Sequence, residues 1–114
     1  MVAPTFWMNA EPSSTIVLKG DLDLAAVKTF ERAMKPAISH GGPVTIDVAQ
    51  LMFIDSTGIR LLAHTARRLG SSGCLIVHGA NARVRKVIDL AGIADGLPNL
   101  HVLDHMHEER QGAA

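Results

Sequence analysis

Hydrophobic residues along this 114-residue chain follow two different spacings, which predict strands and helices in alternation. Short runs rich in β-branched and other apolar residues predict five strands, at residues 5–8, 15–20, 44–48, 74–78 and 100–103. Apolar residues at helical spacing predict three helices, one opening at residues 21–24, one from 56 to about 69, and one over 82–90.

The predicted order is strand, strand, helix, strand, helix, strand, helix, strand. A helix precedes each of the last three strands, so these connections should be right-handed crossovers between parallel strands. We therefore expect an α/β fold with a mixed, mostly parallel sheet of four to five strands, three to four helices and the first strand at an edge. Residues 1–114 should form a single domain, with a core over about 14–103 and a polar tail at 104–114.

Several boundaries of these elements can be read from capping and helix-breaking residues. Asp23 and Asn81 precede predicted helices and are suited to cap them. Pro36 lies late in the first helix and predicts a kink or an early end. We interpret residues 49–54 as a largely apolar bend after the third strand, and residues 92–98 as a turn.

Composition and charge exclude several functional classes. Apolar residues make up 47 % of the chain, and the eleven basic and eleven acidic side chains cancel. The balance argues against nucleic-acid binding and against attraction to an anionic membrane. No apolar run approaches the roughly 20 residues of a membrane span, and no signal peptide is readable. We expect a cytoplasmic protein without membrane insertion, and a buried, structural Cys74 in a reducing compartment.

The most informative segment is Phe-Ile-Asp-Ser-Thr-Gly-Ile-Arg-Leu-Leu at residues 53–62. It places Ser56 where a buried strand should pass into an amphipathic helix. Backbone N–H groups are unpaired there and the helix dipole favours negative charge, so a hydroxyl can cap the helix or accept a phosphate. Asp21, Asp23 and Asp55 also follow strands or begin helices. In a parallel sheet such positions meet at one edge, which favours a docking surface for a partner.

Enzymatic and metal-binding interpretations find less support in the sequence. Ser56 lies outside a G-x-S-x-G elbow, and the Asp-Ser-Thr-Gly run has one residue too many for the Asp-Thr-Gly of aspartic proteases. We therefore expect no catalytic residues. The six histidines form no recognisable ligand pattern, including the group His101, His105 and His107, so we expect no metal site. We interpret the basic residues of the second and third helices as solvated faces: Arg60, Arg67, Arg68, Arg83, Arg85 and Lys86.

The chain resembles STAS domains, and specifically bacterial anti-sigma factor antagonists. The resemblance is carried by Gly-Asp-Leu-Asp at residues 20–23, Val-Thr-Ile-Asp-Val at 44–48 and above all Phe-Ile-Asp-Ser-Thr-Gly-Ile at 53–59. The run Val-Arg-Lys-Val-Ile-Asp-Leu-Ala-Gly-Ile at 84–93 also matches. It covers residues 14–103, approximately.

This resemblance implies a regulatory switch with no catalytic activity or cofactor of its own. The unphosphorylated domain is expected to bind an anti-sigma factor serine kinase and so release a sigma factor, and ATP would belong to that kinase. Phosphorylation at the position of Ser56 would end binding, and a serine phosphatase would restore it. The expected partner-binding residues are Asp21, Asp23, Asp55, Thr57, Gly58, Ile59 and Arg60.

Two alternatives remain open at this point. The chain could be a STAS subunit of a stress-signalling or lipid-transport assembly that binds its partner constitutively, without a phosphate cycle. It could also be a small hydrolase that uses Ser56, although the sequence shows no base or oxyanion hole for it.

Overall fold

A computed structural model describes residues 6–10 and 15–103 of the chain. The predictions for residues 11–14 and for the polar tail at 104–114 lie outside these residues. The five strands are β1 (Phe6–Ala10), β2 (Thr15–Leu22), β3 (Pro43–Ile54), β4 (Cys74–His78) and β5 (Leu100–Leu103). The helices are α1 (Val27–His40), α2 (Ser56–Leu69), α3 (Ala82–Ala91) and α4 (Ile93–Gly96), and short 3₁₀ turns occupy Leu24–Ala26 and Gly70–Ser72.

The strands form one sheet in the order β1-β2-β3-β4-β5, so each strand pairs with its neighbour in sequence. β1 is antiparallel to β2 at the edge, and the other neighbouring pairs are parallel. The predicted α/β class, the mixed sheet and the edge position of the first strand are confirmed.

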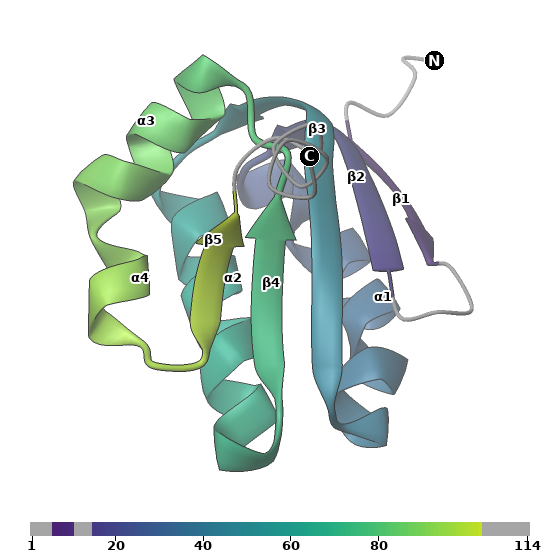
Figure 1. Cartoon of the computed structure of the whole chain (residues 1–114). Coiled ribbons are helices and arrows are strands. Elements are labelled where there is room, and N and C mark those ends of the chain that lie inside the picture. Colours follow the sequence, from purple (N-terminus) through teal and green to yellow (C-terminus); the bar gives the residue numbers. More distant parts are fainter. Residues whose placement is uncertain (1–5, 11–14, 104–114) are drawn as a thin grey trace, which may run out of the picture.

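The helices cover one face of this sheet. Each crossover from β2 to β5 moves one strand in the same direction, and right-handed crossovers of this kind place every connecting helix on the same side. Figure 1 shows α1 and α2 together behind the strands. Burial alternates accordingly along β3: Val44, Ile46 and Val48 are buried under the helices, whereas Thr45 and Asp47 on the other face are half-buried.

β3 is much longer than the predicted strand, and the predicted bend at residues 49–54 is wrong. Its pairing with β2 slips twice, once between Val17 and Lys19 and once between Gly20 and Asp21, so β3 accommodates two extra residues. After Val48 the buried positions are therefore spaced by three rather than two, at Leu51 and Ile54. Each β-bulge breaks the alternation of apolar residues while the strand continues.

Four smaller expectations also need correction. The early end at Pro36 is wrong, because α1 packs against the core on both sides of the proline, through Phe30 and Met34 before it and Ile38 after it. The segment expected to form a turn after α3 contains the short helix α4. Cys74 is half-buried rather than buried. Asp21, expected at a helix start, still lies in β2.

Two asparagine side chains tie the helices to the sheet. Asn81 caps α3 by accepting a hydrogen bond from the Val84 N–H, as predicted, and its Nδ2 also donates to the Leu51 carbonyl of β3 at 3.0 Å. The Nδ2 of Asn99 donates to three carbonyls around the end of α2, with the shortest distance, 2.7 Å, to Ala66. The ends of α2 and α3 are thereby fixed relative to β3 and β5.

Candidate functional site

The candidate site is built at the carboxyl ends of β2 and β3. The last residues of these strands, Leu22 and Ile54, are paired across the sheet. Each is followed at once by an aspartate, Asp23 after β2 and Asp55 after β3. The sheet therefore brings two acidic residues from distant parts of the sequence to neighbouring positions at one edge.

Both aspartates act as helix caps. Asp55 is the N-cap of α2, and its Oδ1 accepts hydrogen bonds from the N–H groups of Thr57 at 2.9 Å and Gly58 at 3.2 Å. Asp23 accepts from the Ala25 N–H at 3.1 Å and caps the 3₁₀ turn before α1. A carboxylate at such a position accepts hydrogen bonds from N–H groups that have no partner within the helix. Its negative charge also interacts favourably with the positive end of the helix dipole.

Ser56 is the first residue of α2 and is exposed. Because Asp55 already bonds to the free N–H groups of the first turn, the hydroxyl of Ser56 is not needed as a cap. The sequence leaves two roles open for this hydroxyl, capping the helix or accepting a phosphate. Asp55 performs the capping. Ser56 is thus a solvent-accessible hydroxyl held at the start of a well-capped helix.

Gly58 holds this helix start close to β2. A Cβ atom at Gly58 would lie 2.6 Å from Ile54 Cγ1 and still closer to the carbonyl oxygen of Leu22, both within the range that real Cβ atoms essentially never show. Only a residue without a side chain permits this approach. Gly58 therefore determines how near the Ser56 turn lies to the end of β2.

Three exposed apolar side chains lie in the segments that carry the two aspartates. Leu24 directly follows Asp23 and is 76 % exposed, and Met52 and Phe53 near the end of β3 are 58 % and 45 % exposed. Met52 and Phe53 were not expected at the surface because their sequence was interpreted as an apolar bend at residues 49–54. The second β-bulge in β3 is the reason that two apolar residues in succession are exposed before Ile54 turns back into the core.

The remaining residues predicted to bind a partner differ in accessibility. Arg60 is exposed, and Asp21 and Thr57 are half-buried. Ile59 is 9 % exposed and packs in the core, so its side chain supports α2 from below rather than presenting itself to a partner. A hollow of about 450 Å³ between α1 and α2 adjoins the site, with Thr57 and Arg60 at this end of it.

The chemistry of the described residues is that of a binding surface. Within residues 6–10 and 15–103, no three His, Cys, Asp or Glu side chains come together in a way that could hold a metal ion. None of the helices in this part of the chain is long and apolar enough to cross a bilayer. The site combines acidic groups, an accessible hydroxyl and exposed apolar side chains, which together suit contact with another protein.

Several solved structures share this fold. An anti-sigma factor antagonist from Mycobacterium paratuberculosis is 23 % identical, with a TM-score of 0.68 over 89 % of this chain and 90 % of that one. The phosphorylated form of the Bacillus cell fate determinant SpoIIAA is 24 % identical, with a TM-score of 0.60 over 95 % and 97 % of the two chains. The STAS domain of a SulP transporter from Vibrio cholerae is 23 % identical, with a TM-score of 0.57 over 91 % and 84 %.

Comparison of sequences gives the family. A search of curated proteins found no match. The family model described as "Mlab, STAS domain" matches residues 9–103, which include every strand from β2 to β5 and all four helices. With most of its length matched by this model and its fold shared with other STAS domains, the chain belongs to the STAS-domain family.

Proposed function

We propose that this protein is an anti-sigma factor antagonist switched by phosphorylation at Ser56. In its unphosphorylated form it binds an anti-sigma factor serine kinase through the ends of β2 and β3 and the start of α2, and so releases a sigma factor. The kinase transfers phosphate from its own ATP to Ser56, and a serine phosphatase removes it. The protein acts by binding alone, holds no cofactor, and works in the cytoplasm with its sigma factor.

The observation that carries this proposal is the accessible hydroxyl of Ser56 at a helix start that another residue caps. A phosphoacceptor must reach the active site of a kinase, and Ser56 is exposed at the first position of α2. The Asp55 hydrogen bonds to the first turn do not involve the Ser56 hydroxyl, so adding a phosphate to that hydroxyl removes none of their donors or acceptors. The fold can therefore tolerate both states of the switch.

The effect of the phosphate follows from its charge. A phosphoserine adds about −1.5 to −2 charges at neutral pH. On Ser56 that charge would stand directly beside Asp55, with Asp23 at the end of the adjacent strand. It is favourable for the dipole of α2 but places a concentrated negative charge, with its hydration, on the docking surface. A partner that closes over this surface must desolvate the charge, which weakens binding.

The test is phosphorylation of the purified protein by its cognate anti-sigma kinase with ATP, followed by intact-mass measurement. The parent should gain one phosphate, Ser56→Ala should gain none, and Thr57→Ala, the control for the neighbouring hydroxyl, should still gain one phosphate at completion even if its kinase binding is altered. Because Ser56 is not the cap, Ser56→Ala should change stability by no more than about 0.5 kcal/mol. Phosphate on Ser56→Ala at the parental level would remove Ser56 as the acceptor.

The docking surface can be tested separately with a pair of aspartate variants. Asp23 and Asp47 each accept one hydrogen bond from an N–H two residues ahead, but Asp47 lies within β3, away from the strand ends. Asp23→Ala should weaken kinase binding about tenfold or more, which corresponds to 1.4 kcal/mol. Asp47→Ala should leave binding unchanged at a similar loss of stability. Equal affinities for the two variants would show that the end of β2 is not part of the interface.

A second candidate is a STAS subunit that binds a transport assembly constitutively. The similarity to the STAS domain of a SulP transporter favours it. In that case Ser56→Ala and the parent should bind the assembly equally, and no kinase should modify Ser56. The phosphorylation experiment therefore separates the two candidates.

A further inference from the structure

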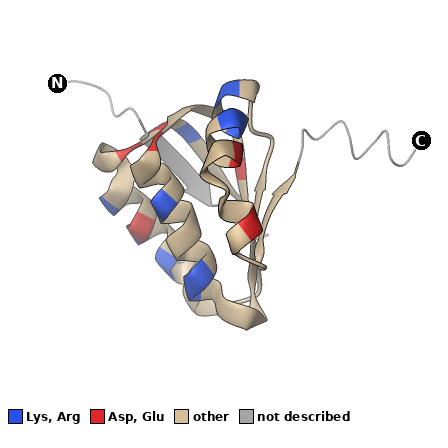
Figure 2. Ribbon diagram, turned by 90° about the vertical axis from the view of Figure 1, so that its left-hand side faces the viewer, with Lys and Arg blue, Asp and Glu red and all other residues tan. Residues whose placement is uncertain are grey.

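The charged residues of α1 and α2 are nearly all basic. The two helices carry six Lys and Arg residues and a single acid, Glu31, although the whole chain has equal numbers of basic and acidic residues. The basic residues are Lys28, Arg32, Lys35, Arg60, Arg67 and Arg68. Figure 2 shows blue positions along these two helices, with most red positions elsewhere and further blue positions on α3.

These basic side chains are not neutralised within the described part of the protein. Arg85 and Asp89 form an ion pair on α3, whereas none of the six basic residues of α1 and α2 forms an ion pair with another described residue. Lys28 and Arg32 even stand four residues apart on one helix, where like charges repel and destabilise it. A solvated helix face, as expected from the sequence, usually mixes both signs of charge.

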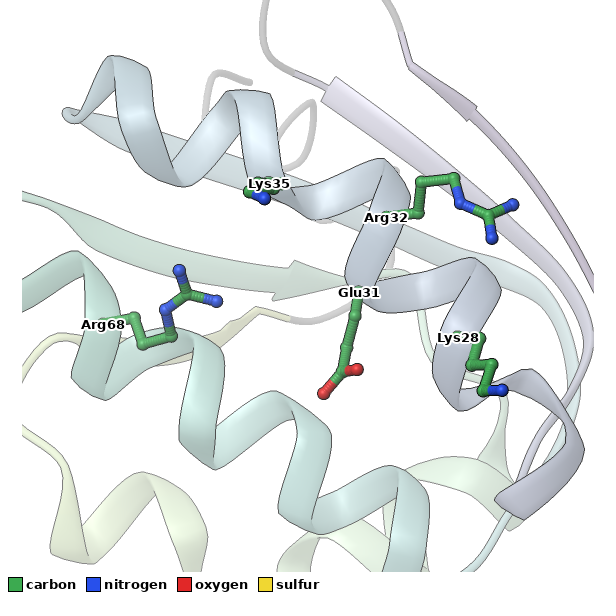
Figure 3. Close-up of a pocket in the computed structure, with 5 residues that line it drawn as sticks. All are labelled: Lys28, Glu31, Arg32, Lys35 and Arg68. Carbon is green, nitrogen blue, oxygen red and sulfur yellow. The ribbon is translucent and has the colours of Figure 1, made fainter.

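The basic side chains surround a groove between the two helices. One hollow of about 510 Å³ is lined by Lys28, Glu31, Arg32, Lys35 and Arg68. It continues at Glu31 into the hollow beside Thr57 and Arg60, whose lining includes the apolar residues Leu24, Val27 and Leu61. In Figure 3, Glu31 points from α1 toward α2 and Arg68 rises from α2 toward α1, so side chains of both helices border one space. We call this space the α1–α2 groove.

We propose that the α1–α2 groove binds an acidic, amphipathic segment of a partner protein. Basic residues along the rims would attract Glu and Asp side chains, and the apolar end at Leu24, Val27 and Leu61 would take hydrophobic ones. A concave groove between helices fits a peptide segment, whereas a bilayer surface would touch only its rims. The chain as a whole has no net charge, so its composition alone does not indicate this local excess of basic residues.

The apolar end of the groove overlaps the proposed switch surface, because Leu24, Thr57 and Arg60 belong to both. The basic part of the groove is made by Arg32, Lys35 and Arg68, which lie outside the residues assigned to the switch surface. The charge-reversal variant and the salt dependence address this basic part, so their outcome does not depend on whether Ser56 is the phosphoacceptor.

The test is a titration of the full-length, unphosphorylated protein with a synthetic helical peptide of Glu, Ala and Leu, its leucines on one face, followed by backbone NMR. We expect saturable binding, with chemical-shift changes concentrated in α1 and α2 and an affinity that falls as salt increases. The same peptide with Lys in place of Glu should not bind. The charge-reversal variant Arg32→Glu/Arg68→Glu should bind the acidic peptide at least about tenfold more weakly.

A matched variant controls for overall charge. Arg83→Glu/Lys86→Glu reverses two exposed charges on α3 and changes the net charge equally, and it should bind like the parent. Equal weakening in both variants would reduce the effect to net charge and overturn the proposal, as would absence of binding at low salt or shift changes outside α1 and α2. Binding to phosphatidylglycerol vesicles but not to the peptide would assign the groove to a membrane instead.

Discussion

Replacing Gly58 with alanine tests the claim that the Ser56 turn is held in place by a close approach to β2. The added methyl group would overlap the Leu22 carbonyl oxygen and lie 2.6 Å from Ile54 Cγ1, and both residues belong to the core. Backbone and buried side chains yield little, so the first turn of α2 must move outward. Overpacking of this kind costs about 1–3 kcal/mol.

Opposing terms are smaller at this position. Alanine is favoured over glycine in a helix interior by about 1 kcal/mol, but Gly58 is only the third residue of α2, where that preference is not fully expressed. Much of this preference is the greater conformational freedom of glycine in the unfolded chain, which is worth about 0.4–1 kcal/mol and is not an additional term. We therefore expect a net loss of roughly 1–2 kcal/mol in the free energy of unfolding. For a domain of this size, each kcal/mol lost should lower the melting temperature by about 2–8 °C.

The measurement is urea unfolding followed by circular dichroism, with Gly96→Ala as the control. Gly96 also lies in a helix, but a Cβ there would meet no atom within 4 Å. Gly96→Ala should therefore be neutral or slightly stabilising. If Gly58→Ala proves as stable as Gly96→Ala, then the contact between α2 and the end of β2 is looser than the structure has it, and the argument for a fixed Ser56 turn fails.

Three further substitutions test other parts of the fold by the same unfolding measurement. Asp55→Ala should cost about 0.5–2 kcal/mol because the first turn of α2 loses its cap, and Asp55→Asn, which keeps an acceptor oxygen, should cost much less; equal losses would mean that the cap is not the cause. Asn99→Ala should cost about 1–3 kcal/mol, since carbonyls at the end of α2 lose their donor, and an unchanged stability would show that water replaces the side chain. Pro36→Ala should stabilise the protein by about 1–3 kcal/mol, because the exposed proline interrupts the interior of α1, whereas a loss would mean that the proline fits this helix without strain.

The parts of the fold that follow a single periodicity were predictable from the sequence. α2 begins at Ser56 and ends at Leu69 as predicted, because its apolar spacing is regular and glycines follow it. Asp23 was predicted to cap the first helix, and it caps the 3₁₀ turn that leads into α1, whose own first turn has no side-chain cap. Such features depend on neighbouring residues, which the sequence shows directly.

The features that were missed depend on contacts between distant residues. The two bulges of β3 are defined only by its register against β2, so the run from Ala49 to Ile54 resembles a bend when it is read alone. The three hydrogen bonds of Asn99 join it to residues about thirty positions away. Within the candidate site, the proximity of Asp23 and Asp55 could be inferred from strand order, but the contact at Gly58 and the exposure of Leu24 required the packed structure.

The bulges of β3 also determine where α2 begins along the direction of the strands. Residues 15–22 of β2 pair with residues 45–54 of β3. Over this paired stretch β3 therefore uses two more residues than β2. Removing one of them, for example Met52, would shorten the strand by about 3.3 Å and turn the residues beyond it to the opposite face of the sheet. Asp55 would then no longer lie beside Asp23 at the ends of the strands, and the helix that carries Ser56 would start earlier along the strand direction. Insertions and deletions in β3 should therefore disturb the site, although neither Ser56 nor its neighbour Asp55 lies in a bulge.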